Sequence, residues 1–280
     1  SSSPDQTGVQ IANINKVTIT LLITTLYLQH PAVAKSKTLG NIFGMKHLLK
    51  HIVSTFSVFL LSLSMSWGDD FKRALNAYKK GDHTIAFEGF KKLAEQGNAA
   101  AQYNVGWMST QGIGTAQDFS EAVKWYTLSA KQGYSTAQYH LAMKHYKGKG
   151  VIQDYKKALK WFLLAAEQGN VLSQYNSGFM FYEGKGTIQD HKEALKWYTL
   201  AAEQGYASAQ TYLGTMYYAG QGGLIEDIVY AHMWFNIGFS NGDENGGKNR
   251  DVVAKRMTPS QIEKAQDLAR ECVKKNYKGC

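Results

Sequence analysis

Residues 134–169 read YSTAQYHLAMKHYKGKGVIQDYKKALKWFLLAAEQG, and residues 170–205 read NVLSQYNSGFMFYEGKGTIQDHKEALKWYTLAAEQG. The second stretch repeats the first with small changes, and two further copies occupy residues 98–133 and 206–242. One glutamine marks the same place in each copy, 36 residues apart: Gln102, Gln138, Gln174 and Gln210. A fixed period of this length is typical of a stacked array of helical units rather than of one globular core.

Each copy predicts two helices. In its first half, apolar and small residues follow one face of a helix, and residues such as Gly106 and Gly178 leave room for a second helix. In its second half, an alanine and a tryptophan recur at i and i+3, followed at i+8 by alanine in three copies and phenylalanine in the fourth, which we interpret as the buried stripe of the second helix. These positions are Ala122, Trp125 and Ala130; Ala158, Trp161 and Ala166; Ala194, Trp197 and Ala202; and Ala231, Trp234 and Phe239.

A glycine loop separates the two halves of each copy. It contains a Gly-x-Gly core, as in Gly148-Lys149-Gly150, and one extra residue, Gly223, lengthens it in the last copy. An aspartate ends each loop and is placed to cap the second helix: Asp118, Asp154, Asp190 and Asp227.

Both ends of the array depart from the repeat. Residues 69–97 form a degenerate first unit whose loop lacks the Gly-x-Gly core. Residues 243–280 are expected to cap the last repeat, with a helix over about 259–275 that begins at Thr258-Pro259-Ser260-Gln261, close to a capping box. The polar, glycine-rich stretch 242–247 reads as the turn before that cap. The sequence therefore predicts an all-α fold in which each helix pair is stabilised by its neighbours.

The motifs resemble a known family. Ala-Gln-Tyr in the first helix, Gly-x-Gly-x-x-x-Asp in the loop and Ala-Ala-Glu-Gln-Gly at the end of the second helix are similar to those of Sel-1-like repeats, short-loop relatives of tetratricopeptide repeats. The likeness covers residues 69 to about 278, and both the period and the loop differ from the tetratricopeptide pattern. It implies a right-handed α/α solenoid of a secreted bacterial type that acts as an adaptor for a protein or peptide partner.

The segment from Met45 to Gly68 has the features of a signal peptide. A basic start is followed by a mostly apolar run from Ile52 to Met65, too short to span a bilayer, and then by small residues. We therefore expect a periplasmic or secreted protein with no stable membrane insertion after cleavage. Residues 1–44 form an upstream extension, read either as lying before a true start at Met45 or as a functional pre-sequence.

Charge and motifs exclude several function classes. The chain carries a formal net charge of +9, and residues 69–280 hold 26 basic and 21 acidic side chains, a net charge of +5. These charges are interspersed, so we expect no nucleic-acid partner. No common nucleophile or metal motif is present, and His140 and His145 are poorly spaced to share a metal. We expect no catalytic residue, cofactor or metal.

The resemblance leaves one enzymatic alternative open. Some cysteine-rich members of the family carry a β-lactamase label, so a β-lactam-binding or β-lactamase-like hydrolase is the competing prediction. Those members place paired cysteines inside each repeat, whereas these repeats contain none, and a Ser-x-x-Lys motif is missing.

The two cysteines, Cys272 and Cys280, both lie at the C-terminus. On an unbroken helix they would be about 12 Å apart, beyond the reach of a disulfide. Lys278-Gly279 allows the tail to fold back and form a bridge in an oxidising compartment. The other reading is a buried Cys272 and a free Cys280.

Columns that vary between the copies predict the binding surface. On the first helix of each copy, the varying positions lie at i, i+3 and i+7 and would form one continuous concave groove across the array. Aromatic residues at Trp107, Phe179 and Tyr212 favour binding over mere exposure. The predicted partner-binding residues are Asn104, Trp107, Gln111, His140, Met143, Lys147, Asn176, Phe179, Glu183, Tyr212, Thr215 and Ala219.

Overall fold

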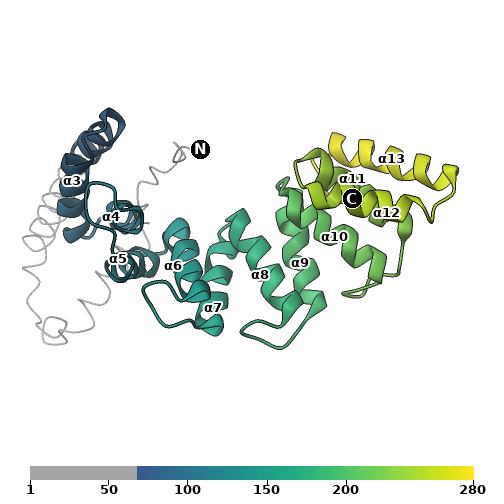
Figure 1. Ribbon diagram of the computed structural model, residues 1–280, viewed down its shortest axis with the longest axis horizontal. Coiled ribbons are helices and arrows are strands. Elements are labelled where there is room, and N and C mark those ends of the chain that lie inside the picture. The colour runs from purple at the N-terminus through teal and green to yellow at the C-terminus, as the bar shows by residue number, and fades with distance from the viewer. Residues whose placement is uncertain (1–67) are drawn as a thin grey trace, which may run out of the picture. The chain divides into compact units, whose positions relative to one another are not determined.

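A computed structural model describes residues 68–280, and within that range the chain contains helices and no strand (Figure 1). The upstream extension 1–44 and nearly all of the predicted signal peptide 45–68 lie outside the described residues. The described part is an all-α solenoid, as the period predicts.

Four helix pairs form the array, and every helix in them is 13 residues long. The first helices are α4 (Ala99–Gln111), α6 (Ser135–Lys147), α8 (Val171–Glu183) and α10 (Ala207–Ala219). The second helices are α5 (Phe119–Lys131), α7 (Tyr155–Glu167), α9 (His191–Glu203) and α11 (Ile228–Ser240). Each first helix packs against its own second helix, which also packs against the next first helix. A helix over 68–80 and α3 (His83–Glu95) precede the array.

The loop aspartates cap the second helices as predicted. Asp118 Oδ1 accepts hydrogen bonds from the backbone N–H groups of Ser120 and Glu121, at 2.8 and 2.9 Å. Asp190 and Asp227 cap α9 and α11 in the same way, and Asp154 caps α7 with one hydrogen bond, from the backbone N–H of Lys157. Asp82, at the start of α3, makes no such bond, which agrees with a degenerate first unit.

The second loop glycine lets each repeat contact the preceding one. Gly150 has a φ of 80°, and a Cβ at this position would lie 2.2 Å from the carbonyl oxygen of Phe119, at the start of α5. Gly133 has a similar φ of 87°, yet a Cβ there would meet no atom within 4 Å. The two glycines therefore share a backbone conformation and differ in their surroundings.

We expect Gly150→Ala to destabilise the protein by about 3 kcal/mol or more, because it adds a backbone clash to a left-handed conformation. Gly133→Ala is the matched control and should cost only about 1–2 kcal/mol, the penalty of the conformation alone. Chemical denaturation of both variants measures the difference. Equal losses would show that the loop moves away from Phe119 without cost.

The buried stripe of the second helices differs from the predicted one by one residue. In α5 the buried positions are Ala122, Tyr126, Ser129 and Ala130, a spacing of i, i+4, i+7 and i+8. The residue after each tryptophan is therefore the core aromatic in every repeat: Tyr126, Phe162, Tyr198 and Phe235. Trp125 and Trp161 lie at the edge of the stripe and are half-buried, whereas Trp197 and Trp234 are buried. The prediction that all four tryptophans are core residues is wrong for the first two.

Small residues on the first helices accept these core aromatics. A Cβ added to Gly178 would lie 2.8 Å from the ring of Tyr198, and one on Gly106 would lie 2.9 Å from the ring of Tyr126. The small residues are thus required for close helix approach, as predicted.

The recurring glutamines connect one repeat to the next. Gln138 Nε2 donates to the carbonyl oxygen of Ala130, near the end of the preceding second helix, at 3.2 Å. Its Oε1 accepts a hydrogen bond from Gln168 of its own repeat at 2.8 Å. Gln102, Gln174 and Gln210 repeat this pattern, with Asn241 as the donor in the last copy. Because both the donor and the acceptor of each buried side-chain amide are paired, few other residue types can replace glutamine at this position.

The C-terminal cap consists of α12 (Glu244–Ala254) and α13 (Pro259–Lys274), which both pack on α11. Thr258 and Gln261 form a full capping box at the start of α13. The stretch 242–247 is not only a turn, because Asp243 caps α12 and the helix begins inside it. Phe239, predicted as a core residue, is 45% exposed; its ring instead approaches Gly247 and lies below the Arg250 guanidinium.

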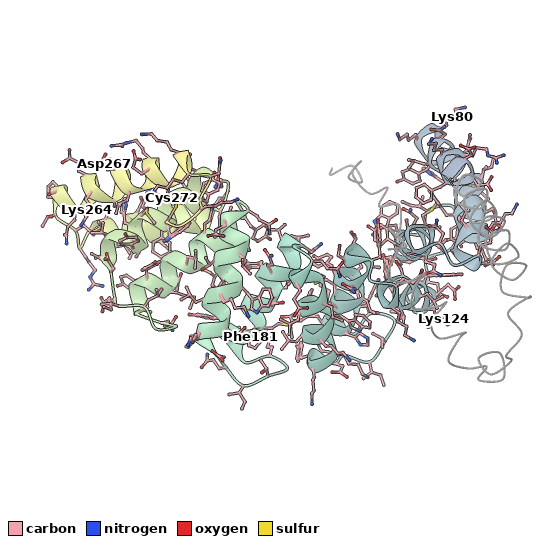
Figure 2. The ribbon with its side chains drawn as sticks, turned by 180° about the vertical axis from the view of Figure 1, so that it is seen from behind. Lys80, Lys124, Phe181, Lys264, Asp267 and Cys272 are labelled. Carbon is pink, nitrogen blue, oxygen red and sulfur yellow. A yellow bond between two sulfur atoms is a disulfide. The ribbon has the colours of Figure 1, made fainter. Side chains whose placement is uncertain are left out.

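A disulfide joins Cys272 to Cys280 and brings their Cα atoms to 5.5 Å. Cys272 lies on the buried side of α13, whereas Lys264 and Asp267 are exposed (Figure 2). Between the cysteines the chain turns back, and the Tyr277 hydroxyl donates to Asn241 Oδ1 at 3.2 Å. Since Asn241 also pairs with Gln210, the tail contacts the last member of the glutamine series.

Candidate functional site

The predicted binding residues occupy equivalent positions on the four first helices. At the seventh position of each repeat, the side chains are half-buried: Asn104, His140, Asn176 and Tyr212. The tenth position is also half-buried, with Trp107, Met143, Phe179 and Thr215. The fourteenth position is exposed, with Gln111, Lys147, Glu183 and Ala219. Each helix therefore presents the same three positions, and their accessibility increases toward its C-terminal end.

Several of these side chains also pack against the core. The Tyr212 ring stacks on Tyr198 with centroids 4.8 Å apart, and the His140 ring stacks on Tyr126 at 5.4 Å. The Trp107 ring packs edge-on against that of Tyr78 in the first unit, with ring centroids 5.9 Å apart. These positions therefore contribute to packing although they vary between the copies.

The two asparagines are already bonded to their own helices. Asn104 Nδ2 donates to the carbonyl oxygen of Ala100 at 2.9 Å, and Asn176 Nδ2 donates to that of Leu172 at 2.7 Å. These bonds fix the side-chain orientation. A partner would therefore meet positioned amide groups rather than freely rotating ones.

Tyrosines outside the predicted set extend the surface around Tyr212. Tyr175 lies 5.9 Å from Tyr212 between ring centroids and 5.0 Å from Tyr206, and Tyr182 lies 5.8 Å from Tyr212. Phe179 closes the group with an edge-on contact to Tyr212 at 6.4 Å. Sequence reasoning missed Tyr175 because its column varies little, although tyrosine at that position in three of four repeats was a visible signal.

Burial keeps two ionisable groups on the inner side of this face, His140 and Tyr103, neutral. It lowers the pKa of His140 to about 4, and Lys144 adds to that effect. Burial likewise raises the pKa of Tyr103, whose hydroxyl lies 3.5 Å from His140 Nε2, to about 12. At neutral pH the half-buried positions of the face thus offer aromatic surface and neutral hydrogen-bonding groups, whereas Lys147 and Glu183 lie at its exposed end. These suit contact with a peptide better than proton transfer, which needs a pKa near the working pH.

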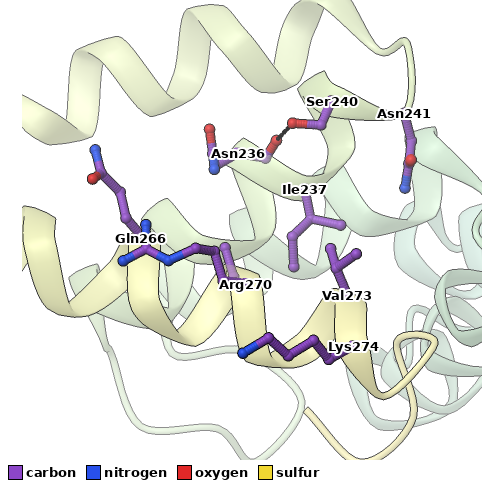
Figure 3. A pocket seen from close by; sticks show the side chains of 9 residues that line it. Asn236, Ile237, Ser240, Asn241, Gln266, Arg270, Val273 and Lys274 are labelled. Carbon is purple, nitrogen blue, oxygen red and sulfur yellow. Dashed lines mark hydrogen bonds between the residues drawn. The ribbon is translucent and has the colours of Figure 1, made fainter.

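A separate cleft of about 470 Å³ lies between α11 and α13 (Figure 3). Asn236, Ser240 and Asn241 line one side, and Gln266, Arg270 and Lys274 line the other. Arg270 pairs with Asp267 on its own helix, and Lys274 pairs with Glu271 at 2.7 Å, so both cations are compensated. No motif predicted this cleft, because it arises only where the cap packs on the last repeat.

Among residues 68–280, no group of three or more His, Cys, Asp or Glu side chains is arranged to hold a metal ion. Over the same range, no helix has both the length and the apolar character needed to cross a membrane.

Comparisons with known proteins agree with the repeat architecture. A family model described as the Sel1 repeat matches residues 99–134, 135–170, 171–206 and 207–243. A crystal structure of a Sel1 repeat protein from Oxalobacter formigenes has a TM-score of 0.61 and 29% identity, covering 72% of this chain and 84% of that one. The protective antigen c5321 of uropathogenic Escherichia coli, which displays an SLR fold, gives a TM-score of 0.50 and 30% identity over 74% of this chain and 54% of its own.

Curated relatives match over a shorter stretch. DAP3-binding cell death enhancer 1 is 51% identical in Rattus norvegicus and 49% identical in Mus musculus, over 45 residues. That stretch is 16% of this chain and only 9% of those proteins. The family model, by contrast, accounts for more than half of the chain. The chain therefore belongs to the Sel1 repeat family.

Proposed function

We propose that this protein is a non-catalytic adaptor that binds a protein or peptide partner along the face formed by α4, α6, α8 and α10. The partner would lie across successive repeats, each of which contributes its seventh, tenth and fourteenth positions. Binding by a continuous surface of this kind is the common use of stacked helical repeats.

The observation that carries the proposal is the group of partly accessible aromatic rings on this face. Phe179 and Tyr212 are half-buried and held by contacts with neighbouring rings, so their positions are set before a partner arrives. Preorganised aromatic side chains lose little conformational freedom on binding and are over-represented among binding hot spots.

We further propose that the adaptor acts in the periplasm or outside the cell. Two features support this location. The segment from Met45 has the composition of a signal peptide. The bond between Cys272 and Cys280 is of a kind that persists in oxidising compartments.

We expect Asn176→Ala combined with Phe179→Ala to abolish partner binding while the protein stays folded, since loss of one hot spot costs about 2 kcal/mol or more. Phe179 makes packing contacts, so a moderate fall in melting temperature is also expected. The measurement is a pull-down from periplasmic extract with the full chain, quantified against circular dichroism of each variant.

Lys160→Ala combined with Leu164→Ala is the control, because both side chains are exposed on the second helix α7. It should retain the partner. Full binding by the α8 double variant would exclude this face, and loss of binding by both variants would show that the effect is not specific to it.

A further inference from the structure

Three lysines at one edge of the array lie against aromatic rings. Lys144 Nζ is 4.4 Å from the centroid of Phe119, and Lys149 Nζ is 5.8 Å from the same ring. Lys185 Nζ lies 4.9 Å from the centroid of Phe179 and donates a hydrogen bond to the Tyr146 hydroxyl at 3.2 Å. Phe119 belongs to the repeat before that of Lys144 and Lys149, and Tyr146 belongs to the repeat before that of Lys185. These cations therefore lie where neighbouring repeats meet.

Lys144 stands in a column that is otherwise apolar. The equivalent residues in the other repeats are Met108, Met180 and Met216, all fully buried. Lys144 itself is only 7% exposed. Burial, together with the nearby charges of Lys149 and Lys147, lowers its pKa to about 8. Methionine would fill this place at lower cost, so packing does not explain the lysine.

These cations have no carboxylate partner in the part of the chain that the structure describes. None of the ion pairs within 4.0 Å among residues 68–280 includes Lys144, Lys147, Lys149 or Lys185. The nearby acid Asp154 caps α7 and pairs with Lys157 at 3.2 Å, and Glu183 acts on Lys185 only at longer range. The edge therefore keeps an excess of positive charge.

Apolar side chains lie at the tips of the same loops. Ile152 is 89% exposed and Ile188 is 88% exposed, at equivalent places in successive repeats. The loops that carry them, between α6 and α7 and between α8 and α9, lie along the lower edge in Figure 1. Ile152 follows Lys149 by three residues and Ile188 follows Lys185 by three residues, so exposed apolar groups lie in the same loops as these cations.

We propose that this lysine edge, formed by Lys144, Lys147, Lys149, Ile152, Lys185 and Ile188, binds an acidic peptide segment that also carries aliphatic side chains. The proposal rests on the adaptor function and specifies the chemistry of the partner. Lys147 belongs both to this edge and to the predicted binding face, and Lys185 contacts the Phe179 ring of that face, so one partner can contact both.

The positions of the cations favour a peptide over a lipid surface. Two of the four cations are held in place, because Lys144 is buried and Lys185 lies between a ring and a hydroxyl, whereas adsorption to an anionic membrane needs side chains that extend freely from the surface. Charges fixed at separate points match carboxylates spaced along an extended chain.

The test uses the full chain and a fluorescein-labelled peptide of alternating Glu and Leu, followed by fluorescence anisotropy. A peptide of alternating Lys and Leu serves as its charge control. We expect saturable binding of the acidic peptide alone, weakened about tenfold or more by Lys149→Glu with Lys185→Glu. Lys160→Glu with Lys264→Glu makes the same change of net charge at exposed positions elsewhere and should leave binding unchanged.

Lys144→Met controls for loss of folding, because methionine occupies this position in the other three repeats. This variant should keep or raise the melting temperature and still weaken binding of the acidic peptide. Absence of binding, equal binding of the basic peptide, or equal loss in the control variant would each overturn the proposal. So would binding only to phosphatidylcholine vesicles that contain about one quarter phosphatidylglycerol. Partner capture that depends on Asn176 and Phe179 but not on these lysines would leave the adaptor function standing and remove only the lysine edge.

Discussion

Deletion of residues 246–280 is expected to lower the melting temperature by at least about 10 °C or to make the protein insoluble. Trp234 and Ile237 of α11 are buried in one cluster with Ala269 and Cys272 of α13. Removing α13 and most of α12 would expose this face, and terminal repeats need a polar outer surface for solubility. A loss of about 5 kcal/mol corresponds to the burial of a few large apolar side chains.

A second variant separates the contribution of the disulfide to stability from that of the cap helices. Cys272→Ser with Cys280→Ser keeps α12 and α13 and removes only the covalent link, so we expect a smaller loss of about 2–3 kcal/mol. Scanning calorimetry of the three proteins under matched conditions gives both values. An unchanged melting curve after deletion would show that α11 needs no cover, contrary to the packing described above.

The array was predictable because its local signals agree with one another. The period of the glutamines, the loop glycines and the capping aspartates each predict the same helix boundaries, and the structure has helices there. A fold can be predicted from its sequence when local and global preferences agree in this way. The capping box at Thr258 was visible for the same reason.

The orientation of the second helices was harder to predict. A tryptophan and a second aromatic stand side by side in every repeat, as in Trp161-Phe162, so recurrence alone does not show which of the two faces inward. The choice depends on a rotation of one residue, about 100° around the helix axis. The small residue opposite, such as Gly178 against Tyr198, decides it, and that pairing becomes visible only in three dimensions.

The sites were predictable only in part. Columns that vary between repeats located one face of the first helices, and their role in binding stays a prediction. Lys144 was hidden, because its column was not expected to be buried and its cation meets Phe119 from another repeat. The cleft between α11 and α13 likewise has residues from two helices that no sequence pattern connects.

Phe162→Ala is expected to destabilise the protein by about 3–5 kcal/mol, more than Trp161→Ala, although tryptophan is the larger residue. Phe162 is 0% exposed and belongs to a cluster with Ala158, Leu159 and Met180. Its removal leaves a cavity between repeats that the rigid helix pairs cannot close. Trp161 is half-buried at the junction of two clusters, so we expect its truncation to cost roughly 1–2 kcal/mol.

The comparison is made by urea denaturation of the two variants beside wild type, with helicity and fluorescence followed together. Two probes are needed because a central cavity in a repeat array can uncouple its halves, and non-coincident transitions would reveal this. Tyr198→Ala beside Trp197→Ala is a useful second pair, because there both aromatics are buried and the two losses should be similar. A larger loss for Trp161→Ala than for Phe162→Ala would mean that α7 is rotated relative to the structure and that the tryptophan stripe is the core after all.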